Sequence, residues 1–82
     1  MFTVYILKSK KKEKYYIGFT SNLEKRLKQH NAGLNKSTVY GRPWVIVRQE
    51  SFDTKIEALN REKQIKSYKG GRAFKALLES GI

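Results

Sequence analysis

Five side chains, Tyr5, Tyr16, Arg26, His30 and Glu62, are of the types that proton transfer and phosphate chemistry use. A phosphodiester under attack needs a base for water, positive charge around the pentacovalent phosphate and a metal to hold the leaving oxygen. Arg26 and a cation bound by Glu62 would supply the charge, and Tyr5 or His30 would handle protons. The set predicts phosphodiester hydrolysis if the fold brings the five together.

The composition excludes several other chemistries. The chain has no cysteine and one histidine, which rules out a thiolate nucleophile and makes a zinc hydrolase improbable. No phosphate-binding loop, dinucleotide fingerprint or Ser-His-Asp arrangement is present. Eighteen basic residues against seven acidic ones give a net charge of +11, which attracts polyanions such as nucleic acid or acidic membranes.

Two short apolar segments predict a β-hairpin. Residues 2–7 and 15–20 are rich in β-branched and aromatic side chains, and a lysine-rich stretch separates them. Those lysines fit either contact with phosphate or a solvated turn. The first segment is too short to span a bilayer and its lysines follow it, unlike those of a signal peptide, so a cytoplasmic location is the default expectation.

Helix signals follow the hairpin. Ser21 and Glu24 form a capping-box pattern for a helix over about 22–31, and Gly33 is suited to end it. A loop over 33–43 leads to a third strand, 44–52, whose first four residues are apolar enough for burial. Thr54 and Glu57 predict the cap of a helix reaching about residue 68, and 73–79 predicts a short terminal helix.

The element order is therefore ββαβαα, an α/β (more narrowly α+β) fold with a three-stranded antiparallel sheet flanked by helices. We expect residues 1–82 to form a single domain, since no repeat or low-complexity linker divides them. A chain of 82 residues buries only about 60% of its unfolded surface. Any active site should then lie near solvent.

Strand alternation relates the two tyrosines. A turn centred near residues 11 and 12 sets Tyr5 opposite Gly18, which makes Tyr5 and Tyr16 neighbours on one face of the hairpin. Gly18 leaves bare backbone between bulky neighbours, which suits either close approach of a ligand or a bulge.

The helical candidates interrupt apolar stripes. Arg26 and His30 flank the leucines of the first helix, where a snorkelling arginine and a packed boundary histidine are the structural alternatives. Glu62 falls in the stripe of the second helix, where an unpaired carboxylate would cost several kcal/mol, roughly. It should pair with a cation, for which Arg26 is the obvious candidate, bind a metal or meet water.

These segments resemble the GIY-YIG nuclease family. The resemblance rests on Val4-Tyr5-Ile6, on Tyr16-Ile17-Gly18, and on the segments RLKQHN and ALNREKQIK, and it spans about residues 3–69. It implies a compact domain with a three-stranded antiparallel sheet flanked by helices. The first motif departs from the family name, since Val4 stands where glycine is expected.

The resemblance also implies roles. Tyr5 matches a tyrosine that acts as general base or positions the water, Tyr16 one at the phosphate, and Gly18 the glycine that closes the second motif. Arg26 matches the arginine that steadies the phosphate, His30 a histidine that assists the base, and Glu62 the sole protein ligand of a divalent metal. An unperturbed tyrosine is ionised about once in a thousand at pH 7, a handicap of about 4 kcal/mol. Arg26 and the metal would have to offset it.

The implied cofactor is Mg²⁺ or Mn²⁺, and the implied partner is nucleic acid, DNA rather than RNA, with a monomer or weak dimer acting on it. A single carboxylate binds Mg²⁺ weakly unless substrate phosphate adds ligands. Further phosphate contacts are expected from basic residues, each of which is otherwise a solvated surface charge: Lys28, Lys36, Arg42, Arg61, Lys63, Lys66, Lys69 and Arg72.

The main prediction is a Mg²⁺-dependent endonuclease or nickase acting on DNA with loose sequence preference. The first alternative is a nucleic-acid-binding module that keeps the fold without catalysis. A basic module for a protein or membrane partner is the second, and it is disfavoured because the helices lack a clean basic amphipathic face.

Overall fold

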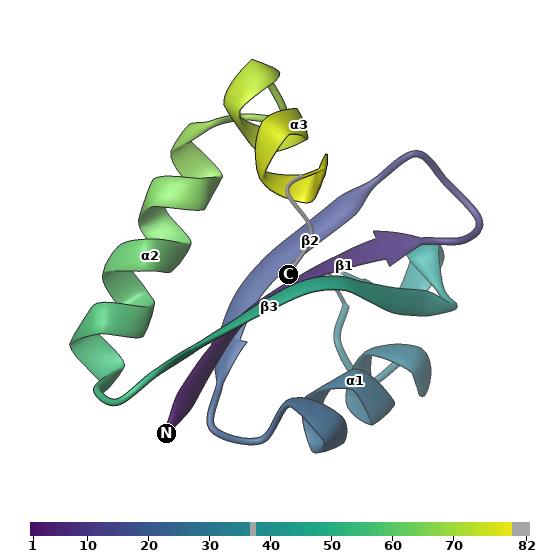
Figure 1. Cartoon of the computed structure of the whole chain (residues 1–82). Coiled ribbons are helices and arrows are strands. Elements are labelled where there is room, and N and C mark those ends of the chain that lie inside the picture. Colours follow the sequence, from purple (N-terminus) through teal and green to yellow (C-terminus); the bar gives the residue numbers. More distant parts are fainter. Residues whose placement is uncertain (37, 80–82) are drawn as a thin grey trace.

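A computed structural model describes residues 1–36 and 38–79 and has the element order ββαβαα (Figure 1). The strands β1 (Phe2–Ser9), β2 (Tyr15–Thr20) and β3 (Trp44–Phe52) form an antiparallel sheet in the order β2-β1-β3. One helix, α1 (Leu23–Asn31), lies on one side of the sheet, and α2 (Lys55–Ser67) and α3 (Arg72–Glu79) lie on the other. The predicted α+β fold is confirmed.

The hairpin has the predicted register. Tyr5 is paired with Gly18 and Leu7 with Tyr16, so Tyr5 and Tyr16 occupy neighbouring positions on one face of the sheet. Because a shift by one residue would send alternate side chains to the opposite face, this register decides whether the two phenols can meet.

Helix α1 begins one residue later than the Ser21 pattern predicted. Its cap is Asn22, whose Oδ1 accepts the backbone N–H of Lys25 at 3.1 Å. The Thr20 hydroxyl accepts the N–H of Asn22 at 3.1 Å, which keeps Ser21 in the turn before the helix. Asn22 is therefore the capping residue in place of Ser21. Gly33 follows the helix with a φ of 80°, a left-handed conformation that glycine adopts without strain.

Helix α2 begins with the predicted capping box. Thr54 accepts the N–H of Glu57, and the Glu57 carboxylate accepts the N–H of Thr54 at 3.2 Å. The helix ends at Ser67, and α3 follows after Gly70 and Gly71. No helix within residues 1–36 and 38–79 is long and apolar enough to cross a membrane.

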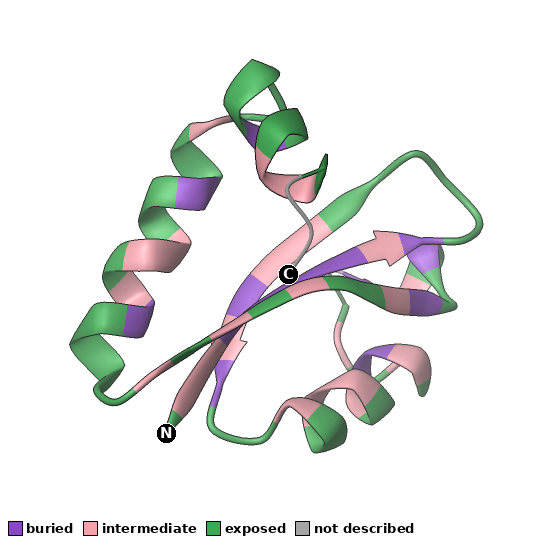
Figure 2. Ribbon diagram, viewed as in Figure 1, coloured by how far each residue is buried: buried purple, intermediate pink, exposed green. Residues whose placement is uncertain are grey.

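The sheet separates two small cores. On the α2 and α3 side, Val4 and Ile6 of β1 pack with Ala58, Ile65 and Phe74. On the α1 side, alternation places the other β1 side chains in a second cluster, which consists of Tyr5, Leu7 and Trp44 with the half-buried Tyr16, Leu23 and Leu27 (Figure 2). The two candidate tyrosines therefore belong to the smaller core, under α1, whereas Glu62 stands on α2 on the other side of the sheet.

The start of β3 is less buried than predicted. Trp44 is buried and Val45 is half-buried, but Ile46 and Val47 are exposed. Strand β3 is at the edge of the sheet, and its pairing with β1 shifts between Ile6 and Leu7, which leaves Val47 outside the ladder. Bulges of this kind turn a side chain out of the regular alternation.

The loop between α1 and β3 is fastened at both ends. The Asn31 side chain accepts the N–H of Trp44 at 2.6 Å and donates to its carbonyl at 3.2 Å, so the end of α1 is bound to the start of β3. A 3₁₀ turn, Val39–Gly41, lies between them, and its Gly41 carbonyl accepts the Ser9 hydroxyl at 2.6 Å. These bonds fix the segment that carries Thr38.

Candidate functional site

A chain of hydrogen bonds runs from β1 through α1 to the α1–β3 loop. The Tyr5 hydroxyl lies 3.2 Å from Nε2 of His30, and Nδ1 of the same ring lies 2.8 Å from the Thr38 hydroxyl. We assign the Thr38 proton to the carbonyl of Asn35, 3.3 Å away, so that Nδ1–H of the histidine donates to the Thr38 hydroxyl. In this tautomer Nε2 is unprotonated and accepts the proton of the Tyr5 hydroxyl.

Burial keeps both partners of this bond neutral. Burial raises the pKa of the Tyr5 hydroxyl well above its ordinary value of 10, with a further rise from Tyr16, an opposing effect of Arg26 and a rise from Glu62. Burial, followed by the nearby charge of Arg26, lowers the pKa of His30 below its ordinary 6.5. At neutral pH the pair is therefore a phenol donating to an uncharged imidazole.

Tyr16 completes an aromatic cluster with these two rings. Its ring centroid lies 6.2 Å from that of Tyr5 and 4.8 Å from that of His30. A Cβ atom placed on Gly18 would lie 2.8 Å from the Tyr5 hydroxyl and 3.1 Å from the Tyr16 ring. The glycine thus makes room for the Tyr5 phenol where it crosses β2, so the close approach at this position is by a side chain of the protein itself.

Arg26 and Glu62 stand on helices on opposite sides of the sheet, Arg26 on α1 and Glu62 on α2. The charge of Arg26 lowers the pKa of the Tyr5 hydroxyl and that of Glu62 raises it. The ion pair between them, one of the expected alternatives, is absent from the described residues. Glu62 instead faces Lys66 one turn later, with 3.5 Å between Oε2 and Nζ, and the Lys66 side chain is more than half exposed. The carboxylate is therefore not enclosed in a tight pair.

The depth of these residues differs from the expectation of a site open to solvent. Tyr5 has 1% of its surface exposed and His30 none, whereas Tyr16 and Arg26 are half-buried and 13% of the Glu62 side chain is exposed. Tyr16, Arg26 and Glu62 are therefore the members with surface left for a ligand. Tyr5 and His30 are covered on the α1 side of the sheet.

The Glu62 carboxylate suits one kind of metal site only. No group of three or more His, Cys, Asp or Glu side chains that could hold an ion occurs within residues 1–36 and 38–79. A single, partly exposed carboxylate fits a hard cation that keeps most of its waters and takes further oxygens from a substrate phosphate. Glu62 fits Mg²⁺ or Mn²⁺ in this manner and does not fit a metal held by protein alone.

The basic residues predicted to contact phosphate are dispersed. Lys36 lines a hollow beside Arg26, and the guanidinium of Arg42 lies over Gly33 in the same loop. Lys28 on α1 is exposed and faces Glu24 at 3.9 Å. The remaining exposed members lie on α2 or at its junction with α3: Lys63, Lys66, Lys69 and Arg72.

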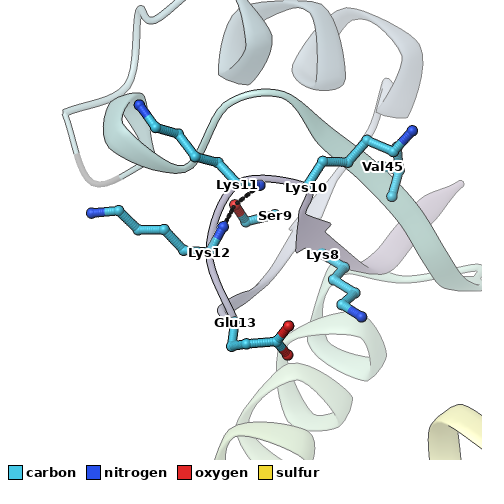
Figure 3. A pocket seen from close by; sticks show the side chains of 7 residues that line it. All are labelled: Lys8, Ser9, Lys10, Lys11, Lys12, Glu13 and Val45. Atoms are coloured by element: carbon cyan, nitrogen blue, oxygen red, sulfur yellow. Dashed lines mark hydrogen bonds between the residues drawn. The ribbon is translucent and has the colours of Figure 1, made fainter.

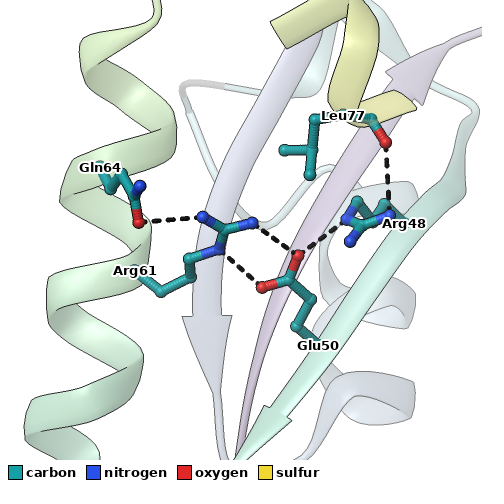
Figure 4. Close-up of polar contacts among 5 residues, drawn as sticks. All are labelled: Arg48, Glu50, Arg61, Gln64 and Leu77. Carbon is teal, nitrogen blue, oxygen red and sulfur yellow. Dashed lines mark hydrogen bonds and ion pairs between the residues drawn. The ribbon is translucent and has the colours of Figure 1, made fainter. Parts of the chain in front are cut away.

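Arg61 differs from the other predicted contacts because its guanidinium is engaged within the protein. It donates to Glu50 of β3 at 2.7 and 3.0 Å and to Gln64 at 2.9 Å, while Arg48 donates to the same carboxylate at 2.8 Å and to the carbonyl of Leu77 (Figure 4). The hydrogen bond to Glu50 raises the pKa of Arg61. This network joins β3, α2 and α3, and we leave Arg61 out of the proposed contact surface.

A basic hollow of about 350 Å³ lies at the tip of the hairpin, lined by Lys8, Ser9, Lys10, Lys11, Lys12, Glu13 and Val45. Its lining includes none of the five candidate residues of the site. Lys8 of this hollow lies over the ring of Tyr15, which packs against Phe74 of α3. Figure 3 shows the four amines pointing in different directions. Such an arrangement adds positive charge to the surface without forming a convergent anion site.

Sequence reasoning missed the residues that orient the histidine. Thr38 and Asn35 lie in a loop without periodicity, and nothing in their types distinguishes them from ordinary turn residues. Asn31 was likewise overlooked, although an amide in the last turn of a helix can bond to a neighbouring backbone.

Comparison with known proteins identifies the family of the chain. Residues 1–73 match the GIY-YIG catalytic domain. The chain belongs to the GIY-YIG family. Membership implies a nuclease-type domain whose partner is nucleic acid, in agreement with the charge of the chain.

Individual relatives extend the match. A UPF0213 protein of Staphylococcus haemolyticus is 43% identical over 77 residues, 93% of each chain, and one of Clostridium perfringens is 50% identical over 64 residues, 77% of this chain and 68% of the other. The solution NMR structure of a UPF0213 protein of Bacillus halodurans has a TM-score of 0.55 and 33% identity, covering 98% of this chain and 84% of that chain. The small GIY-YIG domain predicted from the sequence is confirmed.

Proposed function

We propose that the chain is a divalent-metal-dependent endonuclease or nickase that hydrolyses phosphodiester bonds in DNA with low sequence specificity. The observation that carries the proposal is the oriented pair of Tyr5 and His30, in which Nε2 accepts the phenol proton while Thr38 fixes the other ring nitrogen. A module that only binds nucleic acid has no need of a buried proton acceptor behind a tyrosine.

The pKa directions favour a relay over a free tyrosinate. The attacking water gives a proton to the Tyr5 oxygen as the phenol proton passes to Nε2 of His30, so neither group has to ionise beforehand. The relay needs water at the Tyr5 hydroxyl, which the free protein nearly seals. We propose that binding of the phosphate draws the Arg26 side chain toward it and opens this contact.

Positive charge at the phosphate would come from Arg26, and Tyr16, half-buried beside His30, would donate a hydrogen bond to a phosphate oxygen. Glu62 would hold the divalent ion, which stabilises the charge on the phosphate and on the leaving oxygen. Because Glu62 is its single protein ligand, we expect weak Mg²⁺ binding to the free protein; a tight site would contradict the proposal.

The test incubates the protein with linear, flapped and branched DNA and with RNA, in Mg²⁺ or Mn²⁺. We expect Glu62→Gln and Arg26→Ala to lose at least about a hundredfold in cleavage rate, the usual scale for removing an electrostatic contact to the transition state. Glu62→Gln should bind DNA as well as the wild type or better, because a carboxylate near the phosphate path is lost. Glu79→Gln, an exposed change on α3, is the matched control.

A second candidate is a nucleic-acid-binding module without catalysis. The nearly complete burial of Tyr5 and His30 in the free protein favours it. Binding of all variants, with cleavage by none of them including the wild type, would establish this alternative over the nuclease.

A further inference from the structure

Two hollows flank Arg26, and they differ in chemistry. Both include Arg26 and Gln29 of α1 in their lining. The loop-side hollow, of about 350 Å³, adds Leu34, Asn35 and Lys36, and the cap-side hollow, of about 360 Å³, adds Thr20, Ser21, Asn22 and Lys25. Volumes of this size lie at the small end of the range for small-ligand sites, about 300–1,000 Å³.

The loop-side hollow offers an apolar surface. Leu34 is 74% exposed, and it is the single apolar residue in either lining. The side chain is not part of either core. Its N–H is held by the carbonyl of Gln29 at 3.1 Å, which fixes its backbone beside α1. A flat, weakly hydrated group such as a nucleobase would cover it favourably.

The cap-side hollow is polar throughout. Lys25 provides a positive charge, Ser21 a hydroxyl group and Asn22 an amide whose oxygen caps α1, while the buried Thr20 hydroxyl is bonded to the backbone of Asn22. Hydroxyl, amide and ammonium groups are the usual donors to phosphate and sugar. None of the residues that line this hollow is apolar, so a base would gain no apolar contact there.

We propose that the two hollows are subsites for the nucleotides on either side of the cleaved phosphate, with the base held on the loop side and the sugar-phosphate backbone held on the cap side. This inference rests on the proposed nuclease function and adds recognition to it. The strand crosses α1 over Arg26 and Gln29, and the phosphate shared by both subsites is the one beside Arg26. Leu34 and Lys25 are then the residues that distinguish the two sides of the cut.

The experiment moves a single abasic nucleotide across a mapped cleavage position. On one side of the cut we expect the missing base to slow wild-type cleavage by roughly fivefold or more, the scale of losing one base contact. Leu34→Ala should slow cleavage of the intact strand by a similar factor and should be insensitive to the abasic nucleotide, because both changes remove the same contact. Additive losses, or equal sensitivity on both sides, would overturn the proposal.

A neutral methylphosphonate tests the cap side. Replacing the phosphate next to the other flanking nucleotide should slow the wild type by several-fold, while Lys25→Ala should no longer respond to it. The matched controls are Ile56→Ala, an apolar residue 70% exposed on α2, and Lys75→Ala, an exposed lysine on α3. Both line neither hollow and should respond to the modified strands as the wild type does.

Failure of this inference is separable from failure of the nuclease. Cleavage that is indifferent to every abasic position sinks the subsites and leaves the proposed function intact. If the wild type cuts nothing, the equilibrium binding of the same modified strands is measured instead. The binding of Leu34→Ala should then not respond to the abasic nucleotide, and that of Lys25→Ala should not respond to the methylphosphonate. Equal binding of all strands by the wild type would then refute the two subsites, independently of the nuclease proposal.

Discussion

The Tyr5 hydroxyl is the most constrained atom of the candidate site. It donates to His30, its ring lies beside Tyr16, and its path over β2 depends on the missing side chain of Gly18. The two tyrosines and the glycine were predictable, because strand alternation and a short turn fix their register. The hydrogen bond that orients His30 was not predictable, because its partner Thr38 lies in a loop whose path is set by tertiary hydrogen bonds.

Gly18→Ala tests the close approach at Gly18. The new methyl group would lie 2.8 Å from the Tyr5 hydroxyl, so we expect a loss of about 1–3 kcal/mol in the free energy of unfolding and at least tenfold in cleavage rate. Chemical denaturation measures the first quantity. In the Tyr5→Phe background the alanine should cost less stability, because the clashing oxygen is gone; equal costs in both backgrounds would show that the hydroxyl is not what Gly18 accommodates.

The pH dependence of cleavage distinguishes the relay from a tyrosinate. His30 must be unprotonated to accept a proton, and its pKa is lowered, so activity should be present at neutral pH and be lost only as pH falls below the ordinary 6.5. Tyr5, whose pKa is raised, adds no limb in the neutral range. A rate that instead climbs tenfold per pH unit between pH 6 and 9, roughly, would indicate ionised Tyr5 as the base.

The same histidine couples pH to stability. Because the imidazole is buried and neutral, the unfolded chain binds a proton more readily than the folded chain below pH 6.5. The free energy of unfolding should therefore be full above that pH and decrease as pH falls toward the lowered pKa of the folded state. In a His30→Gln variant, denaturation midpoints measured across this range should lack that part of the decrease.

At the scale of elements, the network around Glu50 fastens both helices on one side of the sheet to β3. The pKa of this carboxyl is lowered, chiefly by the hydrogen bond from Arg61. Burial opposes the shift, and the hydrogen bond from Arg48 adds to it. The side chains of all three residues are less than a quarter exposed. This network was not predictable from residue types, because a glutamate on an edge strand usually faces solvent.

Glu50→Ala should lower the free energy of unfolding by about 2 kcal/mol, since it leaves two half-buried arginines without their carboxylate. The matched control is Glu24→Ala on α1, whose pair with Lys28 has both side chains more than three-quarters exposed and should contribute less than about 0.5 kcal/mol. Thermal or chemical unfolding compares the two. Similar losses would mean that the Glu50 network is no stronger than a surface pair.

The strands and helices themselves were largely predictable. Runs of β-branched and aromatic residues predicted β2 and β3 to the residue and β1 up to two residues before its end, and Thr54 marked the start of α2. The start of α1 was misplaced because the Thr20 hydroxyl captures the Asn22 N–H, a bond between side chain and backbone that two adjacent polar residues do not reveal. The exposure of Ile46 and Val47 was missed because it follows from the bulge and the edge position of β3.

At the scale of the whole molecule, a net charge of +11 governs encounter with nucleic acid. If about five basic residues contact phosphates, the logarithm of the DNA-binding constant should fall with the logarithm of salt concentration at a slope of roughly −4 to −5. Lys36→Ala, beside Arg26, should make the slope shallower by about 1, whereas Lys75→Ala on α3 should not. Binding measured at several salt concentrations decides this, and equal slopes for both variants would place the contact surface elsewhere.

The two cores on opposite faces of the sheet have a consequence for how such a small chain tolerates change. The packing of Val4 and Ile6 against α2 and α3 includes none of the residues that line the two hollows. A library confined to the exposed hollow residues Lys25, Leu34 and Lys36, which lie outside both cores, should therefore yield many soluble proteins with altered substrate preference. The core under α2 and α3 and the residues that line the two hollows are separate parts of one short polypeptide.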